Sequence, residues 1–415
     1  MHNHLGNDYL LGWVNKGFFS ILDQGLFAGT NFALNIILAR WMDCSSYGAF
    51  TTAYSIFLLA GTFHTAILTE PMLVFGAGKY ANYFKSYRDF LIWAHWRFAA
   101  LASLFLGIAS LVFWLGKNPL LPQAFCGLAI SSPFILLLWL VRRTFYPQMK
   151  PHLAAAGGSL YLIILSFTVW FFYHCKMLSL LTVFTAMGLA SGLVSIAFLK
   201  FQKNQQSIFC PIDKQLMIKD HRDYGKWSAA TAGLTWIPGN IYFILLPAII
   251  SFDASAILKA HMNLIMPALH VSSALCLLLL PKFVVEYQQN QSNFIQRVYK
   301  ILLIFAAGSF PYGLLLYCFY KPMLHWLYDG KYQGSTFLTI AICIYPVFGT
   351  LSDVLGSIIR AMNKPAFIFR YNVISVIITL TLGIVFVNQY GIAGAAWAMV
   401  LSSVGMVSGM IIFLH

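Results

Sequence analysis

The chain has 415 residues, of which 60% are hydrophobic and only 9% are charged, and its mean hydropathy is +0.75. Soluble domains carry about 25% charged residues, so this composition excludes a soluble globular protein and indicates a polytopic membrane protein. Lys and Arg outnumber Asp and Glu by 26 to 12. These basic residues lie in short segments between apolar stretches, as membrane topology requires, which argues against nucleic acid binding.

Apolar segments long enough to cross a bilayer recur along the whole chain. A spanning helix needs about 20 mostly apolar residues. By this measure the sequence predicts an all-α fold with about twelve transmembrane helices. They lie at 17–39, 50–77, 91–115, 119–141, 153–174, 177–199, 227–250, 256–281, 298–320, 335–359, 366–387 and 391–414.

Basic residues are concentrated in alternate loops between these segments. The crowded loops lie at 79–88, 142–150, 200–226, 282–300 and 360–370, and the loops between them hold few Lys or Arg residues. Cytoplasmic loops carry an excess of positive charge. The crowded loops are therefore predicted to be cytoplasmic, and an even number of spans places both termini on the same side.

The polar segment 202–226 divides the predicted spans into two sets of six. Pro151 and Pro365, each preceded by Lys, open the fifth and the eleventh span at an offset of 214 residues. Such matching positions suggest two halves of the same orientation, as in transporters with parallel repeats. We predict a six-helix bundle at 1–201, a cytoplasmic linker at 202–226 and a second six-helix bundle at 227–415.

A carboxylate followed by proline, Glu70-Pro71, lies inside the second predicted span. Pro71 lacks a backbone donor and frees the carbonyl four residues earlier, which predicts a disturbed helix. A carboxylate in hydrocarbon is costly and faces a partner or a water-filled cavity. Glu70 is therefore predicted either to bind substrate, H⁺ or Na⁺, or to form a structural ion pair with Arg97.

Further ionisable residues lie in the predicted inner half of the spans. Asp23 either shares the role of Glu70 or pairs with Arg97, and Arg97 either pairs with an acid or binds the oxygens of an anionic substrate group. Asp353 is a further candidate, although it is close in sequence to Arg360 and an interfacial position is the alternative. His64 and His95 could relay protons near neutral pH, but a buried His is more often a packing residue.

Other chemistry is not indicated. The seven Cys residues have no metal-ligand spacing, and we predict no metal and no cofactor beyond a coupling ion. The sequence has no nucleotide-binding G-x-x-x-x-G-K-[ST] motif, so no ATPase is indicated. A membrane enzyme typically needs a large extramembrane loop. The longest loop here is the predicted linker 202–226, which argues against an enzyme.

Three stretches carry a resemblance to a known family. The segment LNIILARWMDCSSYGAF (34–50) resembles the opening of the polysaccharide transporter family, with its Leu-Ala-Arg helix end and the following Tyr-Gly. RAMNKP (360–365) and YGIAGAAWAMVLS (390–402) are similar to later turns and helices of that family. The family exports lipid-linked saccharides, including O-antigen units, and shares a superfamily with multidrug and toxic-compound extrusion transporters and lipid II flippases.

The resemblance implies two six-helix bundles around a central cavity that opens alternately to each side. It also implies a flippase for polyprenyl-diphosphate-linked oligosaccharide in the bacterial cytoplasmic (inner) membrane. Such a flippase would work as a monomer beside polysaccharide polymerase or chain-length machinery. The alternatives are an organic-cation antiporter of the same superfamily and a membrane glycosyltransferase or polymerase.

Overall fold

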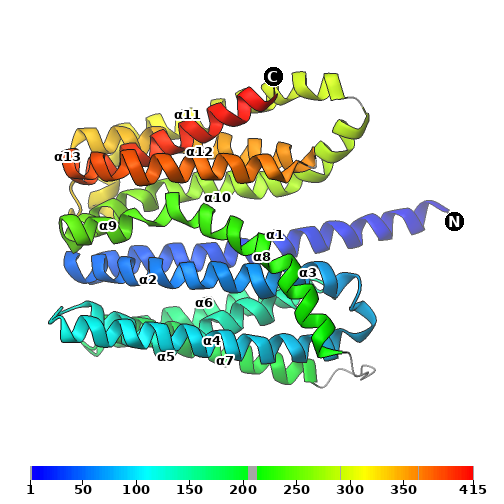
Figure 1. Cartoon of the computed structure of the whole chain (residues 1–415), viewed down its shortest axis with the longest axis horizontal. Coiled ribbons are helices and arrows are strands. Elements are labelled where there is room, and N and C mark those ends of the chain that lie inside the picture. Colours follow the sequence, from blue (N-terminus) through cyan, green and yellow to red (C-terminus); the bar gives the residue numbers. More distant parts are fainter. Residues whose placement is uncertain (1, 204–212, 290, 363, 415) are drawn as a thin grey trace. The chain divides into compact units, whose positions relative to one another are not determined.

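The computed structural model describes residues 2–203, 213–289, 291–362 and 364–414, and almost all of them are helical, as predicted (Figure 1). In chain order the helices are α1 (His2–Trp41), α2 (Cys44–His64), the π-helix η1 (Thr65–Thr69), α3 (Glu70–Ala77), the 3₁₀-helix η2 (Ala81–Tyr83), α4 (Phe84–Leu115), α5 (Leu121–Arg143), α6 (Pro151–His174), α7 (Leu180–Lys203), α8 (Lys214–Asn240), α9 (Tyr242–Ile249), α10 (Phe252–Gln289), α11 (Gln291–Tyr328), α12 (Thr336–Ala361) and α13 (Pro365–Leu414).

Each predicted apolar segment falls on these helices: 50–77 covers most of α2 and all of η1 and α3, 227–250 covers parts of α8 and α9, and each of the others falls on one helix. In the described residues, ten helices are long and apolar enough to cross a membrane, or eleven if the bent pair α8 and α9 forms one span. The twelfth predicted span is the second half of α13, which is 50 residues long. A bilayer crossing takes about 20 residues, so α13 is long enough for two.

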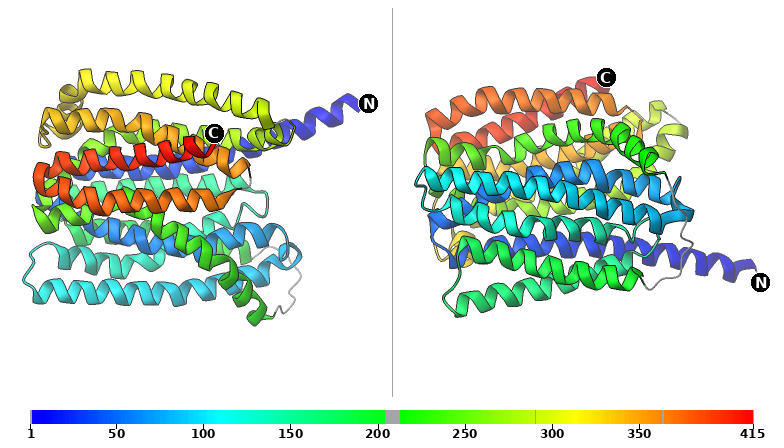
Figure 2. Two further views of the ribbon diagram at one scale, coloured as in Figure 1. Left: turned by 45° about the horizontal axis from the view of Figure 1, so that its top comes forward. Right: turned by 60° about the horizontal axis from the view of Figure 1, so that its bottom comes forward.

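α13 folds back on itself at Gly391. This residue has φ 58° and ψ −131°, a conformation outside the helical region. The hydroxyl groups of Ser375 and Ser402 are 2.5 Å apart, and the rings of Phe367 and Phe413 are 3.8 Å apart. These contacts join residues on the two sides of the bend, and Figures 1 and 2 show the two halves side by side. With α13 counted as two segments, the described helices offer up to twelve candidate spans, in agreement with the predicted all-helical multi-pass membrane fold.

The two halves of α13 approach each other closely at Gly394. A Cβ atom added there would lie 1.9 Å from the carbonyl oxygen of Phe386, so the backbone would have to move. We expect Gly394→Ala to destabilise the protein by about 1–3 kcal/mol, measured as thermal unfolding in detergent. Gly107→Ala is the control because a Cβ there has no neighbour within 4 Å; equal melting temperatures for the two variants would contradict the prediction.

The chain packs into two compact units, each described by itself below. Unit 1 comprises Met1–Leu34 and Ile56–Gly233, and unit 2 comprises Asn35–Ser55 and Leu234–His415. The division of the chain at the predicted linker 202–226 remains a prediction. Part of that segment, 204–212, lies outside the described residues, and the remainder from Lys214 onward is the beginning of α8.

Each unit has its own apolar core. In unit 1, buried residues of η1, α3, α4, α5 and α8 form one cluster around Tyr87, Leu91 and Met217. In unit 2, a second cluster joins α10, α11, α12 and α13 around Phe283 and Ile358. Most of the ionisable residues that the sequence singled out lie in unit 1.

Candidate functional site

Asp23 of α1 is buried in unit 1 and fully provided with partners. One carboxylate oxygen accepts a hydrogen bond from Nη1 of Arg142 at 2.8 Å, and the other accepts from the hydroxyl of Tyr146 at 2.7 Å. The side chains of Asp23 and Arg142 are only 1% and 5% exposed. Burial and the adjacent carboxylate raise the pKa of Tyr146, so its hydroxyl keeps its proton and remains a donor.

The partner of Asp23 differs from the prediction. Arg97 was the partner expected if Asp23 formed an ion pair, and Arg142 was counted among the cations of a cytoplasmic loop. Instead, Arg142 lies at the end of α5, and its guanidinium stacks 4.1 Å from the ring centroid of Phe27. An arginine buried beside an acid and an aromatic face loses its hydration. Charge-assisted hydrogen bonds and stacking on the ring compensate for that loss.

Arg97 does not pair with an acid. Its guanidinium lies 3.8 Å from the ring centroid of Trp93, one helical turn earlier on α4, and its side chain is exposed. Among the described residues it forms no ion pair. Both predicted pairings of Arg97, with Asp23 and with Glu70, are wrong.

Pro71 disturbs its helix in the way predicted. The π-helix η1 separates α2 from α3, and the N–H of Glu70 bonds to the carbonyl of Thr65, five residues earlier. The carbonyl that Pro71 leaves free is that of Ile67. Nδ1 of His221 on α8 bonds to this oxygen at 2.9 Å, so the freed carbonyl is satisfied by a side chain of another helix.

The protonation of His221 follows from its two partners. A carbonyl oxygen only accepts hydrogen bonds, so Nδ1 carries a proton, and in the neutral imidazole Nε2 is then an acceptor. The hydroxyl of Tyr87 lies 2.6 Å from Nε2 and can donate to it. The chain of contacts from Ile67 through His221 to Tyr87 therefore fits a neutral imidazole with its proton on Nδ1, and it connects η1, α8 and α4.

Removing the Tyr87 hydroxyl tests this chain. Tyr87 is fully buried, and Tyr87→Phe leaves Nε2 of His221 without a donor. An unsatisfied buried acceptor costs about 1–3 kcal/mol, so we expect a lower melting temperature of the purified protein in detergent. Tyr83→Phe is the matched control because Tyr83 is 39% exposed; an equal loss in the control would contradict the assignment.

Glu70 is the first residue of α3 and is half-buried. Its carboxylate accepts a hydrogen bond from the hydroxyl of Ser228 on α8. A hydroxyl group carries no compensating charge, so Glu70 differs from Asp23 in having a neutral partner. A carboxylate held by a neutral donor can take up a proton or a cation without breaking an ion pair, which is the property that a coupling residue needs.

His64 and His95, which the sequence suggested separately, form one buried pair. Nε2 of His64 lies 3.0 Å from Nδ1 of His95, and both side chains are 0% exposed. One ring must donate and the other accept, so the pair shares a proton. Two imidazolium rings with centroids 5.2 Å apart would repel each other, so the pair holds at most one extra proton.

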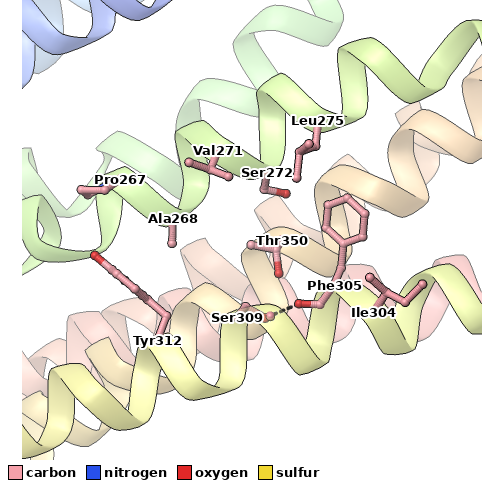
Figure 3. Close-up of a pocket in the computed structure, with 11 residues that line it drawn as sticks. Pro267, Ala268, Val271, Ser272, Leu275, Ile304, Phe305, Ser309, Tyr312 and Thr350 are labelled. Atoms are coloured by element: carbon pink, nitrogen blue, oxygen red, sulfur yellow. Dashed lines mark hydrogen bonds between the residues drawn. The ribbon is translucent and has the colours of Figure 1, made fainter.

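Asp353 lies in unit 2 and accepts a hydrogen bond from Ser273 at 2.9 Å. It lines a small pocket of about 210 Å³ together with Ser357 and Arg360. A second pocket of about 430 Å³ lies among α10, α11 and α12 (Figure 3). No acidic or basic side chain is among the described residues that line it, so it suits an apolar group rather than a diphosphate.

The motif that carries the family resemblance makes structural contacts in unit 2. Arg40 forms two hydrogen bonds with the carboxylate of Asp329, at 3.0 and 3.2 Å. The hydroxyl of Tyr332 donates to the carbonyl of Ala39, and that of Tyr47 donates to the side chain of Asn35. These residues hold the turn between α1 and α2.

Sequence reasoning did not anticipate the side chains that contact the candidate residues. Arg142, Tyr146, Ser228 and His221 each bond to a candidate residue or to the disturbed helix, yet they lie more than 100 residues from it. One signal was available for Arg142: it ends an apolar span on the same predicted side as Asp23. Among the described residues, no group of three or more His, Cys, Asp or Glu side chains could hold a metal ion.

Comparisons with known proteins address the fold. No protein-family model and no curated protein matches this sequence. Solved structures do match. A multidrug resistance MATE family transporter of the MOP superfamily, in an inward-facing conformation, has a TM-score of 0.78 at 12% identity, covering 94% of this chain and 93% of that one.

Two further structures have the same fold. The lipid II flippase MurJ, in an inward closed conformation, has a TM-score of 0.70 at 13% identity, with coverage of 97% and 87%. A mutant of the MATE transporter VcmN from Vibrio cholerae has a TM-score of 0.66 at 14% identity, with coverage of 97% and 95%. The chain therefore shares its all-helical membrane fold with these transporter structures.

Proposed function

We propose that this protein is a flippase that moves a polyprenyl-diphosphate-linked oligosaccharide across the bacterial cytoplasmic membrane for surface polysaccharide synthesis. The fold is common to a multidrug transporter and a lipid II flippase. It therefore supports a transport function but does not distinguish between their substrates. The polysaccharide-transporter motifs at 34–50 and 390–402 favour the lipid-linked saccharide.

The observation that carries the choice of substrate is the pairing of Asp23. A buried carboxylate without a cation would attract an organic cation, and this was the reason to consider a drug antiporter. The carboxylate is instead neutralised by Arg142 and bonded to Tyr146. Breaking a buried ion pair costs about 3–5 kcal/mol, so Asp23 is poorly suited to receive a cationic substrate.

Coupling to H⁺ or Na⁺ is assigned in this proposal to Glu70. Its partner is the neutral hydroxyl of Ser228, and it directly follows η1. π-helical turns are often found at functional sites, because their spare backbone groups allow a helix to change its hydrogen bonds. The His64–His95 pair, at the other end of η1, is the proposed proton relay.

The proposal is tested in the native host. The gene is deleted, and surface polysaccharide and polyprenyl-linked oligosaccharide are quantified together. We expect loss of the surface glycan and accumulation of the lipid-linked precursor, both reversed by a plasmid copy. Normal amounts of both in the deletion strain would contradict the flippase.

The second candidate is an organic-cation antiporter. It is favoured by one observation: the TM-score with the MATE structure, 0.78, exceeds that with MurJ, 0.70. In the same deletion strain, sensitivity to cationic drugs with normal surface glycan would select this function. The drug test therefore separates the two candidates in a single strain.

The remaining expectations belong to the same proposal. Both termini are proposed to face the cytoplasm, the chain is proposed to work as a monomer, and a polymerase or chain-length regulator is the proposed neighbour in the membrane. The charge distribution between loops supports the orientation. The orientation is tested by replacing single lysines with cysteine: Lys117 or Lys176 in predicted outer loops, and Lys85 in a predicted inner loop. The accessibility of the introduced cysteines to a reagent added outside is then compared.

A further inference from the structure

An apolar groove in unit 1 lies among η1, α4 and α8, beside the contact between Ile67 and His221. It has a volume of about 360 Å³. It is lined by Leu68, Phe90 and Trp93, and α8 approaches closely enough that a Cβ atom added to Gly225 would lie 3.4 Å from the Cα atom of Ile67. The groove has room for part of a hydrocarbon chain, and its lining suits one.

Positive charge surrounds this apolar groove. Arg222 and Lys226 of α8 line it, and their side chains are 73% and 57% exposed. Both lie near a single acid, Asp223, at 4.0 and 3.5 Å. Lys214 and Arg97 both lie over the ring of Trp93, and neither forms an ion pair among the described residues. The edge of the groove therefore has cations in excess of acids.

The position of Trp93 along α4 places the groove at the membrane interface. α4 ends at Leu115, and a hydrocarbon core about 30 Å thick takes about 20 residues of helix. Counting back from Leu115 puts the edge of the hydrocarbon near Trp96. Tryptophan and arginine are typical of this level, where an aromatic ring and a cation meet lipid headgroups.

We propose that this groove binds one anionic glycerophospholipid of the bilayer. The part of a fatty acyl chain nearest the headgroup lies in the groove against Phe90 and Trp93, and the headgroup phosphate is held by Arg222 and Lys226. Basic pockets between helices at the membrane surface bind anionic headgroups in this way. Bulk phospholipid is far more abundant than a polyprenyl carrier, so mass action favours the phospholipid as occupant.

The bound lipid would join α8 to η1 at the point where Pro71 weakens the helix. The proposal rests on the membrane fold and on this groove, and it does not depend on which substrate the protein carries. Its failure and the failure of the flippase are therefore distinguishable.

Native mass spectrometry of the purified full chain in detergent tests the proposal. The protein is titrated with phosphatidylglycerol and with phosphatidylcholine of identical acyl chains. We expect the first phosphatidylglycerol to bind about tenfold more tightly, because two cations near the phosphate each contribute to the affinity. Equal binding of the two lipids would overturn the proposal.

Charge removal tests the residues. The double variant Arg222→Gln/Lys226→Gln should lose roughly tenfold in affinity for phosphatidylglycerol and bind the two lipids alike. The matched control is Lys282→Gln/Arg297→Gln, an exposed Lys and Arg that flank a single acid, Glu286, in the same manner. Equal effects of the two double variants would overturn the site.

Filling the groove tests the chain-binding part separately. Ala94→Phe adds a ring to the lining and leaves every cation in place, so it should weaken the first phosphatidylglycerol roughly tenfold. An unchanged affinity would overturn the groove as the chain site. Displacement of phosphatidylglycerol by a tenfold lower concentration of polyprenyl phosphate would also overturn the proposal, since the carrier would then be the occupant.

Discussion

Replacing Arg142 with methionine is expected to lower the stability of the protein by about 3–5 kcal/mol. In the variant the carboxylate of Asp23 stays buried. Among the described residues, the hydroxyl of Tyr146 is then the side-chain partner that it keeps. Methionine matches the length of the arginine stem, so the loss reports the charge more than the packing. The measurement is thermal unfolding of the purified protein in detergent, together with its yield from the membrane.

Two controls separate the ion pair from a general effect of losing an arginine. Arg143→Met removes the adjacent cation, which forms no ion pair among the described residues, and should change the melting temperature little. Asp23→Asn/Arg142→Met removes both charges and keeps an acceptor for Tyr146. Because paired removal of buried charges is often nearly neutral, the double variant should recover much of the loss. No recovery would contradict the assignment.

Glu70→Gln is expected to abolish ion-coupled transport while the protein remains folded and inserted. Glutamine has nearly the same shape and still accepts a hydrogen bond from Ser228, but it cannot bind a proton or balance the charge of Na⁺. Transport of the lipid-linked substrate into proteoliposomes, with and without an imposed ion gradient, measures the effect. We expect the gradient-dependent part to fall at least tenfold.

Glu286→Gln is the matched control for Glu70. Glu286 lies on α10 beside two exposed cations, Lys282 and Arg297, and its replacement should leave transport unchanged. If Glu70→Gln transports as well as the unaltered protein under the same gradient, Glu70 is not the coupling residue. The His64–His95 pair would then be the next candidate to test.

The sequence predicted this membrane fold well because its signal is local. Hydrocarbon demands about 20 consecutive apolar residues for each crossing, and such runs are readable without any knowledge of their neighbours. The hairpin in α13 was predicted as two segments around Gly391, since the glycine and the lengths of the flanking runs are both local features. The disturbance at Pro71 was also local, because the missing N–H frees a carbonyl four residues earlier.

The partners of the candidate residues were not readable in the same way. Arg142 lies 119 residues from Asp23, and Ser228 lies 158 residues from Glu70. Several cations occur on the same predicted side of the membrane, and nothing in a single sequence selects among them. The choice of Arg97 as the partner therefore failed, although the reason for requiring a cation, the cost of a buried carboxylate, was correct.

His64 and His95 show the same difference between what the local sequence indicates and what helix packing decides. Each is an isolated histidine in an apolar segment, for which packing is the expected role, and their 3.0 Å contact exists because α2 and α4 are adjacent in unit 1. The sequence alone thus established the membrane class, the spans and the disturbed helix, since solvation and backbone chemistry act residue by residue. Which charges are neutralised and which keep a neutral partner depended on helix packing, because ion pairs and hydrogen bonds form between side chains that only the folded chain brings within about 3 Å.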